Sequence, residues 1–223
     1  MLLEKLRRVL KELAFRSPAA RLLTPRYHYN FYPAQLACLV STLDEIEHVE
    51  GSVVEVGCFA GATTIFLCEH LADVGQRRRY IAIDTFKGFL LEDVDHEVRA
   101  RAKGAQRQTL STSFGRNRRS WVERSLAING HADVEVIEAD AGTLDYRQFA
   151  PVAFALIDVD LYQPVSRALR AIAPWMSRGG RMIVDDCRPG NIFDGALEAY
   201  MEWCAKADHR PEIVRDRLGV IRF

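Results

Sequence analysis

The chain has 223 residues, the size of one large domain, and 48% of them are hydrophobic, which is enough for one sizeable core. Lys plus Arg and Asp plus Glu are both 30, so the net charge is zero. This balance argues against a general nucleic-acid-binding protein, which needs excess basic residues to neutralise phosphates, and against an acidic disordered tail. No run reaches 18 apolar residues, so we expect no transmembrane helix and no membrane partner.

The N-terminal segment predicts an amphipathic helix. Leucines and a valine of residues 1–15 fall on one helical face and are interrupted by charged residues. We expect this helix to pack on the domain or on a partner subunit, which is compatible with a homodimer; a membrane-surface helix is the alternative. We therefore expect an N-terminal helical extension or lid over residues 1–48 and one domain over 49–223. The five scattered cysteines form no C-x-x-C pair, which indicates reduced thiols and a cytoplasmic protein.

Beyond the extension, strand and helix patterns alternate. Pro33 predicts the start of a helix that runs to about residue 47. Short apolar runs predict strands, and longer periodic segments predict helices, in the order strand 52–56, helix 62–72, strand 80–84, helix 121–129, strand 134–137, strand 153–157, helix 164–175, strand 181–184 and helix 195–207. Residues 213–223 predict one or two antiparallel strands, and residues 90–119 a long loop. This alternation predicts a Rossmann-like, doubly wound α/β fold with a mostly parallel sheet.

Acidic residues recur at the ends of the predicted strands. In open α/β sheets these carboxyl ends form the ligand crevice. Any one of these acids could instead cap the helix that follows it. Six acids at five strand ends favour a binding site, and they are Glu55, Asp84, Asp140, Asp158, Asp185 and Asp186.

The loop after the first predicted strand indicates a nucleoside cofactor. It reads Glu55-x-Gly57-x-x-x-Gly61 and opens a helix, where glycines permit close backbone approach to a ligand. A dinucleotide site prefers G-x-G-x-x-G, whereas Phe59 replaces the middle glycine here. This difference argues against an NAD(P)-dependent oxidoreductase, which stays an alternative. Asp84, at the end of the next strand, is placed to bind the two ribose hydroxyls.

These motifs resemble those of class I S-adenosylmethionine-dependent methyltransferases across roughly residues 50–190. The resemblance implies a seven-stranded, mostly parallel sheet with helices on both faces. It also implies that the loop cradles the methionine moiety, that the acid ending the second strand binds ribose, and that the acid ending the third strand contacts adenine. The cofactor-binding residues expected on this basis are Glu55, Gly57, Cys58, Phe59, Gly61, Thr63, Asp84, Thr85, Phe86, Asp140, Ala141 and Asp158.

Two acidic motifs predict a metal site. Asp158 and Asp160 follow the fourth strand, and Asp185 and Asp186 follow the fifth. Four neighbouring carboxylates repel one another unless they are paired, and a divalent cation such as Mg²⁺ would resolve the repulsion. Helix capping, or pairing with an arginine such as Arg188, is the alternative. A cation would also help to activate an aliphatic hydroxyl, which is a poor nucleophile at neutral pH.

Asp-x-Asp-Leu-Tyr followed by Gly-Gly and Asp-Asp is similar to the macrocin O-methyltransferase family, as is the segment Asp84–Phe89. The resemblance implies that Asp158, Asp185 and Asp186 bind Mg²⁺, that Asp160 is the general base, and that the acceptor is a sugar hydroxyl. Catechol-type O-methyltransferases share the metal but carry Asp-Asn at the second motif and use a lysine base near the first. No lysine lies between 158 and 170, so a sugar-type alcohol is the preferred acceptor and a catechol the alternative.

Residues 99–124 contain eight basic residues and one acid. They predict either a solvated helix face or a lid that meets an anionic substrate, such as a phosphorylated sugar or sugar nucleotide. Together these features predict an S-adenosylmethionine- and Mg²⁺-dependent O-methyltransferase that acts on a sugar or a glycosylated natural product. A noncatalytic Rossmann-like binding subunit is the remaining alternative, and the crowded acids argue against it.

Overall fold

The computed structural model describes residues 2–17, 20, 27 and 29–223. The chain divides into two compact units, one comprising residues Met1–Asn30 and the other Phe31–Phe223. Helix α3 (Pro33–Glu45) therefore belongs to the larger unit, although the sequence predicts it within an extension over 1–48. The larger unit contains the whole sheet.

The larger unit is built on a seven-stranded sheet in the order β3-β2-β1-β4-β5-β7-β6. The strands are β1 (Ser52–Val56), β2 (Tyr80–Asp84), β3 (Glu135–Glu138), β4 (Val152–Ile157), β5 (Met176–Val184), β6 (Glu212–Val214) and β7 (Leu218–Arg222). The first five strands pair in parallel, whereas β7 is antiparallel to both of its neighbours. The predicted mostly parallel α/β fold is thereby confirmed.

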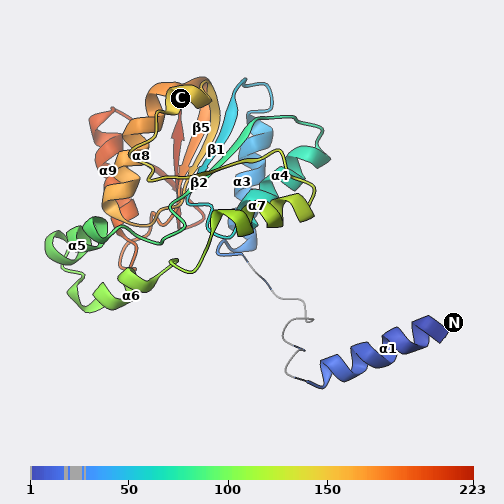
Figure 1. Cartoon of the computed structure of the whole chain (residues 1–223). Coiled ribbons are helices and arrows are strands. Elements are labelled where there is room, and N and C mark those ends of the chain that lie inside the picture. Colours follow the sequence, from blue (N-terminus) through green and yellow to red (C-terminus); the bar gives the residue numbers. More distant parts are fainter. Residues whose placement is uncertain (1, 18–19, 21–26, 28) are drawn as a thin grey trace. The chain divides into compact units, whose positions relative to one another are not determined.

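Helices cover both faces of this sheet (Figure 1). Helices α8 and α9 lie on one side, and α3, α4 and α7 lie on the other. Besides α3, the α-helices of the larger unit are α4 (Ala62–Asp73), α5 (Leu91–Ala100), α6 (Arg107–Thr112), α7 (Arg119–Ile128), α8 (Tyr162–Ile172) and α9 (Gly195–Lys206). Short 3₁₀ helices span Gly104–Gln106, Tyr146–Phe149 and Ala173–Trp175.

Both central strands are buried along their full length because helices cover them on each side. Val54 and Val56 of β1 pack in one core cluster with residues of α8 and α9, including Leu169. The alternate residue Glu55 faces α4, where the hydroxyl of Thr64 donates to it. The strand order reverses at β1 and β4, and in this topology ligands bind at the carboxyl ends of such neighbouring strands.

The prediction of a long loop over 90–119 is wrong. This segment contains α5, a 3₁₀ turn and α6, and Val94 and Leu110 form a small core with Leu161. Arg101 stabilises the segment because its guanidinium pairs with Glu97 at 2.9 Å, with Asp194 at 2.7 Å and with Glu198. Several of the basic residues of segment 99–124 therefore form ion pairs with acidic residues of the fold.

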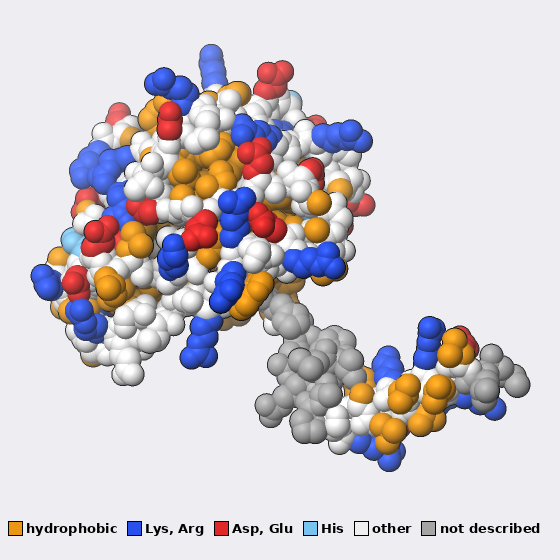
Figure 2. All heavy atoms as spheres, in the orientation of Figure 1, with side chains coloured by type: hydrophobic (Ala, Val, Ile, Leu, Met, Phe, Trp, Pro, Cys, Tyr) orange, Lys and Arg blue, Asp and Glu red, His pale blue; other side chains and the backbone are white. Residues whose placement is uncertain are grey.

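The N-terminal unit contains α1 (Leu2–Phe15), as the sequence predicts. Large apolar side chains are exposed along this helix, among them Leu3, Leu6, Leu10 and Leu13 (Figure 2). Among the described residues, we find no helix of the length and hydropathy needed to cross a membrane.

We predict that Arg101→Met lowers the free energy of unfolding by about 3–5 kcal/mol, because it leaves the buried carboxylate of Glu97 without its ion-pair partner. The measurement is urea unfolding followed by circular dichroism. Arg99→Met is the matched control, since Arg99 is 79% exposed and lies 3.8 Å from Asp95, an arrangement that contributes about 1 kcal/mol or less. Equal losses in the two variants would contradict a structural role for Arg101.

Candidate active site

The loop after β1 lies directly against the carboxyl end of β4. Gly57 has a φ of +95°, and a Cβ added there would lie 1.8 Å from the backbone oxygen of Asp158. Only glycine fits this approach. The amide of Gly57 also donates to the carbonyl oxygen of Ile83 at 2.7 Å, which fixes the loop to β2. The predicted cofactor loop is thus joined to the first acid of the predicted metal site.

Asp84 connects the loops that follow β1 and β2. Its Oδ2 accepts the amide of Phe59 at 2.8 Å, and its Oδ1 accepts the amide of Phe86 at 2.7 Å. Both phenylalanines have positive φ, at 43° and 53°, a conformation that is costly for bulky residues and found where surrounding structure enforces it. Burial raises the pKa of the Asp84 carboxyl despite these hydrogen bonds. Asp84 therefore fixes the two loops between which the sequence predicts ribose binding.

Glu55 supports the glycine loop from inside the fold. The side chain is 2% exposed, and its Oε2 accepts hydrogen bonds from Thr64 and from the hydroxyl of Tyr80, both at 2.7 Å. Burial raises the pKa of this carboxyl from 4.5 to about 7. These contacts give Glu55 a role in holding β1, β2 and α4 together beneath the loop.

The other predicted cofactor residues follow β1, β2 and β3 in the chain. Burial raises the pKa of the Cys58 thiol well above its usual value, so this side chain stays protonated. Gly61 directly precedes the first residue of α4. Thr63 lies in the first turn of that helix and is half-buried. The hydroxyl of Thr85 donates to Gly88 at 2.7 Å, and the buried Ala141 accepts from the Tyr146 hydroxyl at 3.0 Å.

Asp140, the predicted adenine contact, has a partner that the sequence analysis missed. Arg167 of α8 lies 3.4 Å from the Asp140 carboxylate and makes a two-pronged contact with Asp93 at 2.9 and 2.8 Å. This arginine links α5 and α8 to the end of β3. Its position in a helix of mixed composition gives no sequence signal for that role.

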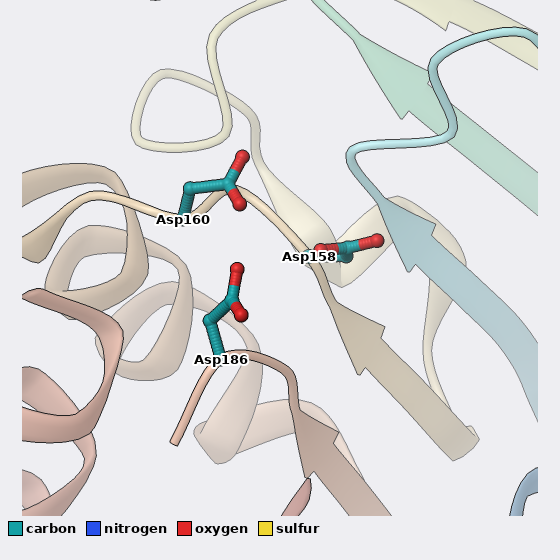
Figure 3. A group of neighbouring side chains, drawn as sticks. All are labelled: Asp158, Asp160 and Asp186. Atoms are coloured by element: carbon teal, nitrogen blue, oxygen red, sulfur yellow. The ribbon is translucent and has the colours of Figure 1, made fainter. Parts of the chain in front are cut away.

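Three of the four predicted metal-site aspartates gather at the ends of β4 and β5 (Figure 3). Asp158, Asp160 and Asp186 each offer a carboxylate oxygen, and these atoms lie within 4.8 Å of one another. We call these three residues the acidic triad. Asp160 and Asp186 have positive φ, at 60° and 56°, so two of the three side chains project from strained backbone.

Burial and mutual repulsion dominate the electrostatics of the triad. Burial raises the pKa of Asp158 well above its usual range, and the charges of Asp185 and Asp160 raise it further. Burial likewise raises the pKa of Asp160 strongly, with a second contribution from the carboxyl group of Asp186. A cluster of carboxylate oxygens with this charge excess has the donor set that hard divalent cations prefer, so these residues fit a magnesium ion.

Asp185, the fourth acid, has another partner. Arg217, which directly precedes β7, donates from Nε to Oδ1 of Asp185 at 2.6 Å and from Nη2 to Oδ2. Its Nε also lies 3.2 Å from Oδ1 of Asp186. The arginine at this site is therefore Arg217 and not the exposed Arg188. Sequence reasoning missed it because 32 residues separate Arg217 from Asp185 and its turn carries no recognisable motif.

The segment before α7 lies over the glycine loop. Asn117 donates from its side chain to the carbonyl oxygen of Phe59, and the Phe114 ring lies 5.3 Å from the Phe59 ring. Nearby, the Arg118 guanidinium lies over the Trp121 ring at 5.5 Å. Part of the predicted lid thus contacts the predicted cofactor loop.

We predict that Glu55→Gln removes a pH dependence of folding. The raised pKa of Glu55 means that the folded chain binds this proton more tightly than the unfolded chain. The stabilisation of the folded chain by this proton is fully present below pH 4.5 and is lost as the pH rises through about 7. Relative to wild type, the variant should therefore gain up to about 3 kcal/mol between pH 4.5 and 8, measured by urea unfolding.

Glu135→Gln serves as the control with the opposite sign. The hydrogen bond from Arg79 lowers the pKa of Glu135, so its contribution to stability is present at neutral pH and is lost on acidification. If the free energy of unfolding of Glu55→Gln changes with pH in the same way as that of wild type, the raised pKa of Glu55 is contradicted.

Both the sequence and the fold of this chain are similar to those of known proteins. The sequence profile of a methyltransferase domain matches residues 54–187. The fold is similar to that of the O-methyltransferase NovP, with a TM-score of 0.75 and 21% identity over 88% of this chain and 82% of that one. It is also similar to CalS11, a TDP-rhamnose 3′-O-methyltransferase of calicheamicin biosynthesis, with a TM-score of 0.59 and 18% identity over 97% and 92% of the two chains.

An O-methyltransferase from Bacillus cereus in complex with SAH gives a TM-score of 0.52 and 15% identity over 95% and 88% of the two chains. A search of curated protein sequences gave no match. The matched profile runs from β1 through the end of β5, and so it includes the glycine loop and all four aspartates. The chain belongs to the methyltransferase domain family and has the class I S-adenosylmethionine-dependent methyltransferase fold.

Proposed function

We propose that this protein is a cation-dependent O-methyltransferase that transfers the methyl group of S-adenosylmethionine to a hydroxyl of a sugar or glycosylated small molecule. The observation that carries the proposal is the direct contact between Gly57 and the backbone oxygen of Asp158. It brings the predicted methyl-donor loop against the acidic triad. Methyl transfer needs this juxtaposition, because donor carbon and activated oxygen must meet within bonding reach.

The loops that follow β1 and β2 support the cofactor assignment. Asp84 is fixed by two backbone amides and would bind the ribose hydroxyls, while Asp140, held by Arg167, would contact adenine. The Gly57–Gly61 loop would contact the methionine moiety through its backbone. The similar enzyme from Bacillus cereus was solved with SAH, which supports the same cofactor here.

The acidic triad supports the chemistry of the acceptor. Asp158 and Asp186 would hold Mg²⁺, which in proteins needs only one or two carboxylates besides water and substrate. When bound, the cation would lower the pKa of the acceptor hydroxyl, and S-adenosylmethionine would supply the methyl group. Asp160 lies within the same 4.8 Å group and would take the hydroxyl proton as general base. The sequence also predicts Asp185 as a ligand, but Arg217 engages both of its oxygens.

Three observations support a sugar-type acceptor. No lysine lies between 158 and 170 to serve as the base of a catechol-type enzyme. NovP is an O-methyltransferase, and CalS11 is a TDP-rhamnose 3′-O-methyltransferase. Arg116, which directly precedes Asn117, and Arg124 of α7 form no ion pair with any residue that the structure describes, and these cations would suit an anionic acceptor such as a sugar nucleotide.

We predict that Asp84→Ala weakens binding of S-adenosylhomocysteine at least tenfold, or about 1.4 kcal/mol, because it removes the ribose contact and frees both loops. Isothermal titration calorimetry measures the affinity. Asp73→Ala, an exposed acid at the end of α4, should bind like wild type. Wild-type protein that binds NADH and not S-adenosylhomocysteine would overturn the cofactor assignment.

We predict that Asp160→Asn lowers kcat by about 10²–10⁴-fold because it removes the general base. Affinity for S-adenosylhomocysteine should stay unchanged, and stability should not fall, since the change removes one of several crowded acids. The assay is S-adenosylhomocysteine release with TDP-deoxysugars and glycosylated small molecules, before and after chelation of Mg²⁺. Turnover of catechol alone would favour the catechol-type alternative. Activity that survives chelation would contradict the proposed dependence on a divalent cation.

A further inference from the structure

We propose that Arg217 is a positioning residue that keeps Asp185 away from the cation. It takes Asp185 as its own ion-pair partner, and the acids left to surround the cation and the reacting hydroxyl are those of the acidic triad, Asp158, Asp160 and Asp186. The inference rests on the proposed function, because it concerns the same cation.

The contact between Arg217 and Asp185 is a fork. Nε and Nη2 reach the two different oxygens of one carboxylate, and the Asp185 side chain is fully buried. Such two-pronged, charge-assisted pairs are the strongest side-chain hydrogen bonds and fix the orientation of both partners. A cation could recruit Asp185 only by breaking both hydrogen bonds of this pair, and breaking an ion pair whose carboxylate is fully buried is costly.

Strained backbone places Arg217 at this position. The turn between β6 and β7 contains Arg215 and Asp216, with φ values of 53° and 58°. Two consecutive residues with positive φ form the hairpin turn that normally selects Asn-Gly. Here neither residue is glycine, so the turn carries a conformational cost that the surrounding contacts must offset. Its geometry delivers Arg217 to the exit of β5, where the Cys187 amide donates to the Arg217 carbonyl oxygen at 2.8 Å.

Residues just before and within the first turn of α3 also contact Arg217 and its turn. The guanidinium lies 5.4 Å from the centroid of the Phe31 ring, which is buried. The side chain of Gln35 donates to the carbonyl oxygen of Arg215 at 3.4 Å. Arg217 is thus held by an aromatic face, by its own turn and by the strand end after β5, and a side chain held on so many sides is suited to fixing its partner.

The positive charge of Arg217 affects how tightly the acidic cluster binds a cation. When all four aspartates are ionised, one arginine leaves an excess of three negative charges, and a divalent cation would favour that ionised state. Arg217 offsets the charge of Asp185 and, at 3.2 Å from Asp186, moderates that of one triad member. Removing the positive charge should therefore tighten cation binding, and removing Arg217 together with Asp185 should restore the original balance.

The test is titration of Mn²⁺, a spectroscopic substitute for Mg²⁺, followed by electron paramagnetic resonance on the full chain with S-adenosylhomocysteine present. We expect Arg217→Met to bind Mn²⁺ at least tenfold more tightly than wild type. The double variant Arg217→Met/Asp185→Asn should return to within about threefold of wild type, because it removes one positive and one negative charge and no triad ligand. Arg222→Met is the matched control, since Arg222 lies on β7 and pairs with the exposed Glu212, and should bind like wild type.

The double variant decides the proposal. If it loses Mn²⁺ affinity tenfold or more while remaining folded by circular dichroism, Asp185 is a ligand and the proposal is wrong. If Arg217→Met does not fold, Arg217→Gln replaces it, because the amide keeps a donor toward Asp185 without the charge, and the same directions are expected. If the wild-type protein binds no Mn²⁺, the cation dependence in the proposed function is wrong, and this inference is wrong with it. Loss of affinity in the double variant alone leaves the proposed function standing.

Discussion

The concentration of acidic side chains at the ends of β4 and β5 is the constraint on which the rest of the site depends. Asp185 and Asp186 are buried, and Asp158 and Asp160 are half-buried. Desolvation and mutual repulsion both disfavour ionised carboxylates there, as the raised pKa values of Asp158, Asp160 and Asp185 indicate. Such a cluster survives in a folded protein only when protons, arginines or cations offset its charge. The strained backbone at Asp160 and Asp186 is a further cost paid to keep the acids together.

The topology of the sheet brings the parts of the site to one edge. Parallel strands end on the same side, so the loops after β1, β2, β4 and β5 meet there. The antiparallel strand β7 begins where its neighbour β5 ends, as the pairing of Val184 with Gly219 shows. The hairpin turn before β7 therefore emerges at the carboxyl edge of the parallel strands. An antiparallel addition to a parallel sheet is in this way able to supply a charged side chain, Arg217, to a site built by the parallel strands.

The sequence predicted the features that depend on local pattern. The apolar runs of β1 and β4, the glycines of the first loop and the acids at strand ends are short-range signals, and each lies where it was expected. Residues 90–119 were missed because their two short helices are mainly polar and depend on distant ion pairs such as that of Arg101 with Asp194. The partners of Asp140 and Asp185 were missed for the same reason, since both arginines become neighbours only through the completed fold.

Five aspartates of one chemical type acquire different roles through their partners. Asp84 is held by backbone amides, Asp140 lies beside Arg167 and Asp185 is held by Arg217, so each has a fixed counterpart. Asp158 and Asp160, by contrast, form no ion pair among the residues that the structure describes, and the carboxyl groups nearest to them belong to other aspartates. An acid whose neighbours are acids is the one that gains most from a cation or a proton. This is why the proposed function gives Asp158 and Asp160, together with Asp186, the roles of ligand and base. Asp84, Asp140 and Asp185 already have fixed counterparts in backbone amides and arginines.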